Sequence, residues 1–183
     1  MSKPPDFSGK SHEQICAELN ARRLPVSVAI FGSLNEFNIG GMIRSAHNFT
    51  VKEIHLVEVE WFYKKGALST YKYEKNQIRR WPTLAEFLAG TENRNLVALE
   101  KRDGLPSKDL CSYVWPENPI LFFGSEKTGV PDVILEASKD VVSIPMMGLN
   151  NDHNVTSALS IAVYDWYSKY IKIGQITPVL LSA

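Results

Sequence analysis

The sequence predicts an α/β fold in which a mostly parallel sheet is flanked by helices. Short, continuous apolar runs rich in β-branched residues recur along the chain, which is typical of strands buried on both faces. Segments with apolar residues at helical spacing separate these runs, and this alternation favours crossover connections between parallel strands. The expected strands are residues 26–31, 53–59, 95–99, 120–123 and 140–144.

The first 24 residues are expected to form an N-terminal tail and a short helix. Two prolines and few apolar residues predict that residues 1–10 pack loosely. Ile15 and Leu19 lie about one helical turn apart within residues 11–20, which indicates a short helix there. The first strand follows almost directly.

The later helices are predicted by their end signals. Asn38 is of a type that caps helix N-termini, and apolar residues at helical spacing follow it to about residue 49. A short helix is expected at residues 83–89, and Pro131 suits the first turn of another. Asn154 stands where a cap would stand, directly before a long final helix that runs to about residue 171.

Composition limits the kind of protein. The chain has 183 residues, which favours one domain over residues 1–183. Twenty Lys and Arg balance twenty Asp and Glu, so any nucleic-acid-binding surface must be local. The sequence lacks a membrane-spanning apolar run and a signal-peptide core, so a cytoplasmic location without membrane contact is expected. Cys16 and Cys111 lie far apart, and no ligand spacing indicates a metal site.

The first stretch that carries chemistry opens the helix at Asn38. Gly40 and Gly41 are unfavourable in a first helical turn, so they indicate that a ligand or another helix approaches the backbone. Arg44 follows on the same face, and an Arg beside a helix N-terminus can hold a phosphate. The alternative is a surface Arg on a helix that packs tightly through its glycines.

The second stretch follows the predicted strand at residues 120–123. Gly124 and Gly129 bound a polar turn, whose backbone N–H groups could hold the polar edge of a ligand. Glu126 within the turn can accept hydrogen bonds from hydroxyls or amines. In isolation the same pattern is also that of a plain loop.

The third stretch follows the predicted strand at residues 140–144. Pro145 ends the strand because it cannot donate to a ladder, and a polar loop then leads to Asp152, His153 and Asn154 at a helix start. A strand, a polar loop and a helix start form a ligand site at the carboxyl end of many parallel sheets. The alternative is an ordinary connection between a strand and a helix.

Residues 61–81 are basic and aromatic, and no secondary structure is assigned to them. Tyr, Trp and Phe rings interleaved with cations suit single-stranded or looped RNA, whereas a solvated face with a few core rings would give the same pattern. Glu74 stands there against six cations: Lys64, Lys65, Lys72, Lys75, Arg79 and Arg80.

Together and in this order, the three stretches resemble the motifs of the SpoU (TrmH-like) family of RNA ribose 2′-O-methyltransferases, within the SPOUT superfamily. The family pattern Asn-x-Gly-x-x-x-Arg-x-Ala is matched at residues 38–46. An apolar strand followed by Gly-x-Glu-x-x-Gly is matched at residues 121–129. A third motif, which begins Ile-Pro-Met and ends in Asn-Val before a helix, is matched at residues 144–155. The resemblance spans about residues 26–167.

This resemblance implies a fold, a cofactor and an assembly. The C-terminal part would form a deep trefoil knot, with S-adenosylmethionine bent inside it. The chain would act as a homodimer, with the final helix as part of the interface through Val155, Leu159, Val163, Tyr164 and Trp166; alternatively, these residues face the chain's own core. The residues implied at the cofactor are Leu99, Gly124, Ile144, Met146, Asp152 and His153.

The implied reaction is attack of a ribose 2′-oxygen of tRNA or rRNA on a sulfonium methyl group. Arg44 is the implied catalytic residue; because Arg is effectively always protonated, we expect it to bind a phosphate and stabilise the forming alkoxide. Asn38, Glu126 and Asn154 would orient Arg44, the ribose and the loops. Besides Arg44, the candidates for RNA contact are Lys64, Lys65, Lys72, Arg79 and Arg80.

The chain departs from the family at Asp152 and His153, where a Ser-Leu pair is usual. Asp152 could act as a general base, have no effect, or impair turnover, while His153 could pack flat against adenine. Two other functions therefore stay open. One is a non-catalytic RNA-binding protein that kept the fold. The other is a SPOUT enzyme that methylates a base, although the motif of Asn38 and Arg44 favours ribose methylation over this function.

Overall fold

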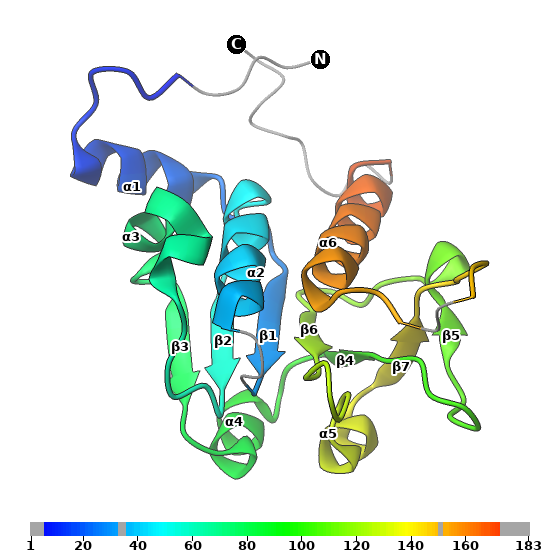
Figure 1. The fold of residues 1–183 in the computed structure, drawn as a ribbon. Helices are drawn as coiled ribbons and strands as arrows, with labels where there is room; N and C mark the ends of the chain where they lie inside the picture. Colours follow the sequence, from blue (N-terminus) through cyan, green and yellow to red (C-terminus); the bar gives the residue numbers. More distant parts are fainter. Residues whose placement is uncertain (1–5, 33–35, 150–151, 173–183) are drawn as a thin grey trace.

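The computed structural model describes residues 6–32, 36–149 and 152–172. Within these residues seven parallel strands form one sheet, in the order β3-β2-β1-β6-β4-β7-β5 (Figure 1). The strands are β1 (Ser27–Phe31), β2 (Ile54–Val57), β3 (Ile78–Trp81), β4 (Leu96–Leu99), β5 (Lys108–Asp109), β6 (Ile120–Phe123) and β7 (Asp140–Ser143).

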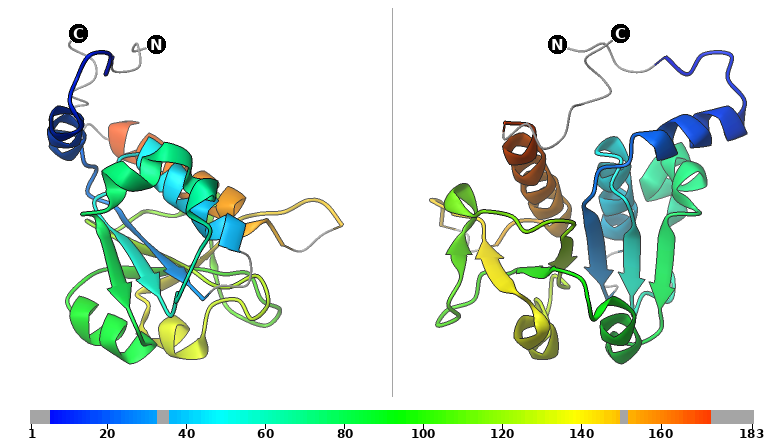
Figure 2. Two further views of the ribbon diagram at one scale, coloured as in Figure 1. Left: turned by 60° about the vertical axis from the view of Figure 1, so that its left-hand side comes forward. Right: turned by 180° about the vertical axis from the view of Figure 1, so that it is seen from behind.

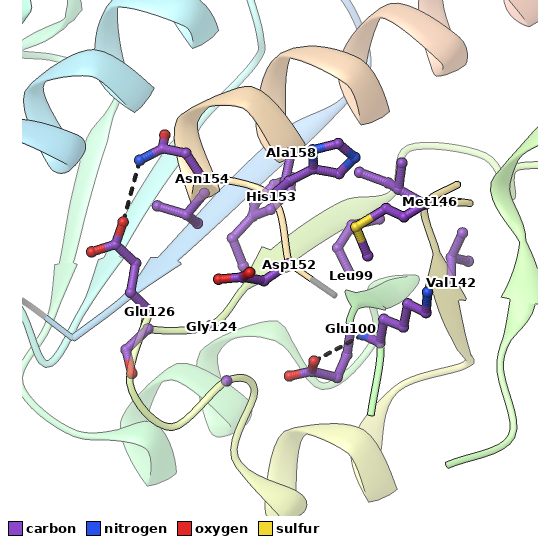
Figure 3. A pocket seen from close by; sticks show the side chains of 16 residues that line it. Leu99, Glu100, Gly124, Glu126, Val142, Met146, Asp152, His153, Asn154 and Ala158 are labelled. Atoms are coloured by element: carbon purple, nitrogen blue, oxygen red, sulfur yellow. Dashed lines mark hydrogen bonds between the residues drawn. The ribbon is translucent and has the colours of Figure 1, made fainter. Parts of the chain in front are cut away.

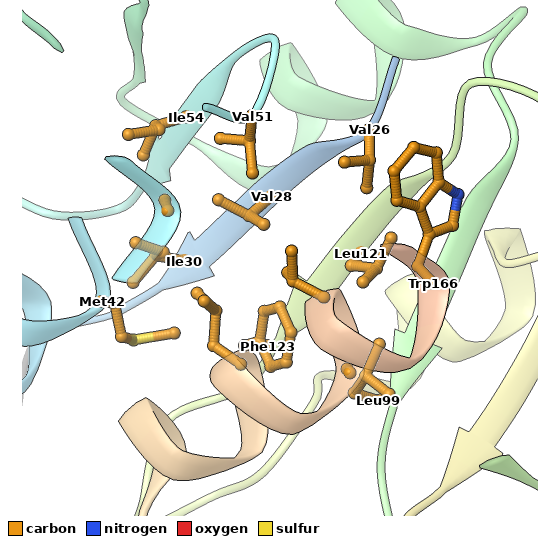
Figure 4. Packing of buried hydrophobic residues seen from close by; sticks show 14 of the residues in the cluster. Val26, Val28, Ile30, Met42, Val51, Ile54, Leu99, Leu121, Phe123 and Trp166 are labelled. Atoms are coloured by element: carbon orange, nitrogen blue, oxygen red, sulfur yellow. The ribbon is translucent and has the colours of Figure 1, made fainter. Parts of the chain in front are cut away.

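Helices cover both faces of the sheet (Figure 2). On one face α2 and α6 pack against β1 and β6 through the larger apolar cluster, part of which is drawn in Figure 4. On the other face α4 and α5 pack through a smaller cluster around Phe87 and Ile134. The helices are α1 (His12–Ala21), α2 (Glu36–Asn48), α3 (Tyr71–Glu74), α4 (Leu84–Thr91), α5 (Asp132–Ala137) and α6 (Val155–Lys172), with short 3₁₀ helices η1 (Lys64–Thr70) and η2 (Leu110–Ser112).

The strand order places the ends of distant segments beside one another. From β1 the chain builds outward through β2 to β3, whereas β6, β4 and β7 lie on the other side of β1. Such a reversal of strand order leaves a crevice at the carboxyl ends of the strands, where α/β proteins bind ligands. The carboxyl ends of β1, β4, β6 and β7 therefore all lie at the same edge of the sheet.

The five predicted strands are confirmed, and two further strands were missed. Strand β3 lies within residues 61–81 and carries Arg79 and Arg80, both exposed, because it is the edge strand beside β2. Strand β5 is only two residues long and pairs with β7 alone. Neither shows the continuous apolar run by which a central strand is identified. The trefoil knot implied by the family resemblance stays a prediction.

The first turn of α2 corrects one prediction and resolves another. The helix begins at Glu36, so Asn38 lies inside the first turn and is not the N-cap. A Cβ on Gly40 would come within 2.8 Å of the backbone of Gly66 and Ala67 in η1, and one on Gly41 within 3.2 Å of the Thr156 side chain. Both glycines thus allow other helices to approach α2. Of the two explanations for the glycines, close packing of another helix is therefore the one that the structure shows.

Helix α6 is both capped and buried as a core element. The side-chain oxygen of Asn154 accepts a hydrogen bond from the Thr156 N–H at 3.0 Å, which confirms Asn154 as an N-cap. Leu159, Val163 and Trp166 are fully buried within the chain itself. The expectation that these three residues form a dimer interface is therefore wrong, because the sheet already covers their face of the helix.

No helix in the described ranges is long and apolar enough to cross a lipid bilayer.

Replacing Gly40 with alanine should destabilise the protein. Alanine normally favours a helix by about 1 kcal/mol over glycine, but a methyl group 2.8 Å from the η1 backbone should reverse that sign and cost roughly 1–3 kcal/mol. Urea unfolding measures the change. Gly148→Ala is the control, because a Cβ there meets nothing within 4 Å. A Gly40→Ala protein as stable as the wild type would contradict the packing described here.

Candidate functional site

A cavity of about 550 Å³ opens at the carboxyl ends of β4, β6 and β7, beside the start of α6 (Figure 3). Its size lies within the range of about 300–1,000 Å³ that is usual for small-molecule sites. The six residues expected at a cofactor all line it: Leu99, Gly124, Ile144, Met146, Asp152 and His153. The residues that the family resemblance implied come from three loops, and all of them line this one cavity.

Two glycines shape the turn after β6. The backbone N–H groups of Ser125 and Gly129 each donate to the other residue's carbonyl, at 3.1 and 2.9 Å, so the turn is tight. A Cβ on Gly124 would lie 2.1 Å from the carbonyl carbon of Gly129, and Gly129 itself has a φ of +66°. Only glycine fits at both positions, and the space left between the turn and α6 is part of the cavity.

Glu100 is a cavity residue that the sequence reasoning missed. One carboxylate oxygen accepts from the N–H of Lys101 at 2.8 Å, and the other accepts from the N–H of Val130 at 2.6 Å. The side chain thereby ties the loop after β4 to the turn after β6. Its position directly after a predicted strand was the signal that could have identified it.

Three polar side chains from three distant stretches meet at the cavity. Asn38 Nδ2 donates to Glu126 Oε1 at 2.6 Å, and Asn154 Nδ2 lies 3.2 Å from both that oxygen and Asn38 Oδ1. The Thr156 hydroxyl also donates to the Asn38 carbonyl at 3.3 Å. The structure thus joins the first, second and third motifs through side chains up to 116 residues apart.

Arg44 lies outside this network. It is exposed on α2, does not line the cavity, and makes no hydrogen bond or ion pair with the part of the chain that is described. Its guanidinium is therefore available to a group that arrives from outside the protein.

The predicted RNA-contact cations separate into two groups. Lys64, Lys65 and Lys72 are exposed, and their ammonium groups lie over tyrosine rings at 5.1, 5.9 and 4.7 Å from the ring centres. Arg79 instead lies 3.5 Å from the Glu53 carboxylate, and Arg80 donates to the Val59 carbonyl at 3.0 Å. The three lysines are thus the cations with no carboxylate or carbonyl partner among the described residues.

The acidic residue among these cations does not reach the surface. Glu74 is fully buried, with Arg23 and the His47 ring nitrogen each 2.7 Å from its carboxylate. A buried carboxylate needs such partners, because desolvation otherwise disfavours its charge. Residues 61–81 therefore present a more basic surface than their composition suggests.

A parallel sheet covered on both faces, with a polar network and a small-molecule cavity at its strand ends, is the arrangement of an α/β enzyme. The chain belongs to the SpoU rRNA methylase family, whose family model matches residues 25–164. This match covers all three motifs and the whole of the cavity.

Individual relatives agree with the family match. The tRNA (guanosine(18)-2′-O)-methyltransferase of Thermus thermophilus is 21% identical over 86% of this chain and 82% of its own length. The 23S rRNA (adenosine(1067)-2′-O)-methyltransferase of Streptomyces azureus is 46% identical over 27% of this chain, but the match spans only 19% of that protein.

Solved structures share the fold. The A. aeolicus TrmH/SpoU tRNA modifying enzyme matches with a TM-score of 0.76 at 19% identity, over 93% of this chain and 90% of that one. The SpoU methyltransferase AviRb from Streptomyces viridochromogenes, in complex with the cofactor AdoMet, matches with a TM-score of 0.70 at 19% identity, over 82% of this chain and 62% of that one.

The side chains of the described residues contain no cluster of three or more His, Cys, Asp or Glu that could hold a metal ion.

Replacing Asn154 with aspartate should destabilise the protein in a pH-dependent way. The variant keeps the capping oxygen, but a carboxylate replaces the amide 3.2 Å from Glu126. Two carboxylates so close cannot both ionise freely, so we expect a loss of about 1–3 kcal/mol at pH 8 that shrinks towards pH 5 as the pair takes up a proton.

Asn154→Ser is the matched control, because serine also caps helices but adds no charge. Urea unfolding of both variants from pH 5 to 8 measures the difference between them. A difference that does not change with pH would show that the Asn154 amide is not close to Glu126 in solution.

Proposed function

We propose that this protein transfers a methyl group from S-adenosylmethionine to a ribose 2′-hydroxyl of tRNA or rRNA. The observation that carries the proposal is the meeting of Asn38, Glu126 and Asn154 beside the cavity. This network brings polar groups from all three motifs to one place beside the cavity, where they could position a ribose. Membership of the SpoU rRNA methylase family and the activities of the relatives support the same reaction.

The residues of the cavity fit S-adenosylmethionine. Leu99, Ile144, Met146 and Ala158 offer apolar surface to an adenine and a thioether chain, and the tight turn at Gly124 leaves room beside the backbone. The carboxylates of Glu100, Glu126 and Asp152 suit a ligand that carries positive charge. When bound, this cofactor supplies an electrophilic methyl group on a sulfonium.

Arg44 is the proposed catalytic residue. Since its guanidinium stays protonated, it would bind the phosphate next to the target ribose and stabilise the 2′-oxygen as that atom gains negative charge. The network of Asn38, Glu126 and Asn154 would position the ribose and the loops around it. The exposed position of Arg44 on α2, six residues after Asn38 on the same helix, supports this role.

The RNA would extend from the cavity over the basic surface of residues 61–81. Lys64, Lys65 and Lys72 would contact phosphates, and the tyrosine rings beneath them could stack with unpaired bases. Arg79 and Arg80 would contribute less, because the protein already holds them.

The remaining expectations complete the proposal. Each chain would form one catalytic domain, since all the strands in the described ranges join one sheet. Two chains would pair through surfaces that include the exposed side of α6, where Tyr164 is 60% exposed. A cytoplasmic location follows from the proposed tRNA and rRNA substrates.

Calorimetric titration with S-adenosylmethionine should show saturable binding close to one ligand per chain. Labelled-methyl transfer should then follow into tRNA or rRNA, and the modified linkage should resist alkaline hydrolysis, because the 2′-oxygen can no longer attack the phosphate. Binding without transfer into any RNA would favour the non-catalytic alternative. Labelled base in place of labelled ribose would favour a base methyltransferase.

Arg44→Ala should lower turnover by about 10²–10³-fold, as expected for the loss of a group that stabilises an oxyanion. Affinity for S-adenosylmethionine should stay within about twofold, because Arg44 does not line the cavity. Lys52→Ala, which removes an exposed cation away from the site, is the control and should leave both quantities unchanged. Full turnover by Arg44→Ala would exclude the proposed role.

A further inference from the structure

The three carboxylates of the cavity differ in their hydrogen bonding. Both oxygens of Glu100 accept from backbone N–H groups, and Oε1 of Glu126 accepts from the side chains of Asn38 and Asn154. Asp152 has no hydrogen bond or ion pair with any residue that the structure describes. Its charge is therefore not compensated by the protein around it.

Asp152 is an exposed residue that lines the cavity. It precedes the start of α6, and Figure 3 shows its carboxylate directed towards the side of the cavity where Gly124 and Glu126 lie. Lys101, the cationic residue that lines the same cavity, forms no ion pair with these acids in the described structure. Among the described residues, the lining thus carries three carboxylates against one ammonium group.

The two forms of the proposed cofactor differ in charge at one atom. In methyl transfer the C–S bond breaks with its electron pair remaining on sulfur, a C–O bond forms, and the hydroxyl proton passes to water. The sulfonium therefore becomes a neutral thioether of almost the same shape. Apolar contacts hold both forms nearly equally, whereas a carboxylate near the sulfur attracts the sulfonium and not the thioether.

We propose that Asp152 makes the cavity discriminate by charge, strengthening the binding of S-adenosylmethionine relative to S-adenosylhomocysteine. The proposal rests on the proposed function and adds a specificity-determining residue to it. It also accounts for an acid at a position where the family usually has serine. With Asp152 in place, loss of the methyl group removes an attraction and so favours release of the product.

The test is a calorimetric comparison of both ligands on the wild type and two variants. Asp152→Asn keeps the shape and removes the charge, whereas Asp103→Asn makes the same charge change at an exposed site outside the cavity. In Asp152→Asn we expect affinity for S-adenosylmethionine to fall about three- to tenfold, with little change for S-adenosylhomocysteine. Asp103→Asn should change neither affinity.

Salt provides a second measure of the same interaction. Raising the ionic strength from about 0.05 to 0.5 M should reduce the preference of the wild type, since Asp152 is exposed to solvent, and should affect Asp152→Asn less.

Equal changes for both ligands in Asp152→Asn would overturn the charge proposal and leave the proposed function intact. No binding of either ligand to the wild type, alone or with added tRNA, would overturn the proposed function and this inference together.

Discussion

One carboxylate oxygen of Glu126 accepts hydrogen bonds from the amides of both Asn38 and Asn154. These bonds join the first turn of α2, the turn after β6 and the N-cap of α6, so the three segments cannot move independently. The same Asn154 side chain caps α6 through its oxygen, which couples the position of a helix to the geometry of the site. Because an amide has both donors and an acceptor, Asn154 can cap the helix through its oxygen and bond to Glu126 through its nitrogen.

The sheet makes this meeting possible. Strand β6 lies between β1 and β4, so the loop after the sixth strand opens beside the helix that follows the first. The glycines of α2 let η1 and α6 approach its first turn closely, and Asn38 is held there. The tight turn bounded by Gly124 and Gly129 then leaves space between the strand ends and α6 for a ligand.

Most of the charged groups discussed above have partners within the protein, and a few exposed ones have none among the described residues. Arg23 neutralises the buried Glu74, whose carboxylate the His47 ring also contacts, and Arg79 and Arg80 are held by the protein. Arg44 is exposed and has no such partner among the described residues, and the same holds for Lys64, Lys65 and Lys72. In the cavity, Asp152 likewise has no hydrogen-bond or ion-pair partner among the described residues. The net charge of the chain is zero, yet the surface of residues 61–81 is basic and the cavity lining is acidic.

Sequence alone determined the central strands, the cap of α6, the residue types of the site and the likeness to the SpoU family, because these depend on local patterns. The edge strand β3, the burial of Glu74, the helical partners of Gly40 and the inward face of α6 were decided by contacts between distant segments. Asn38 shows the difference most clearly. Its type predicts a cap, yet its side chain bonds to residues 88 and 116 positions away, and only the strand order brings them together.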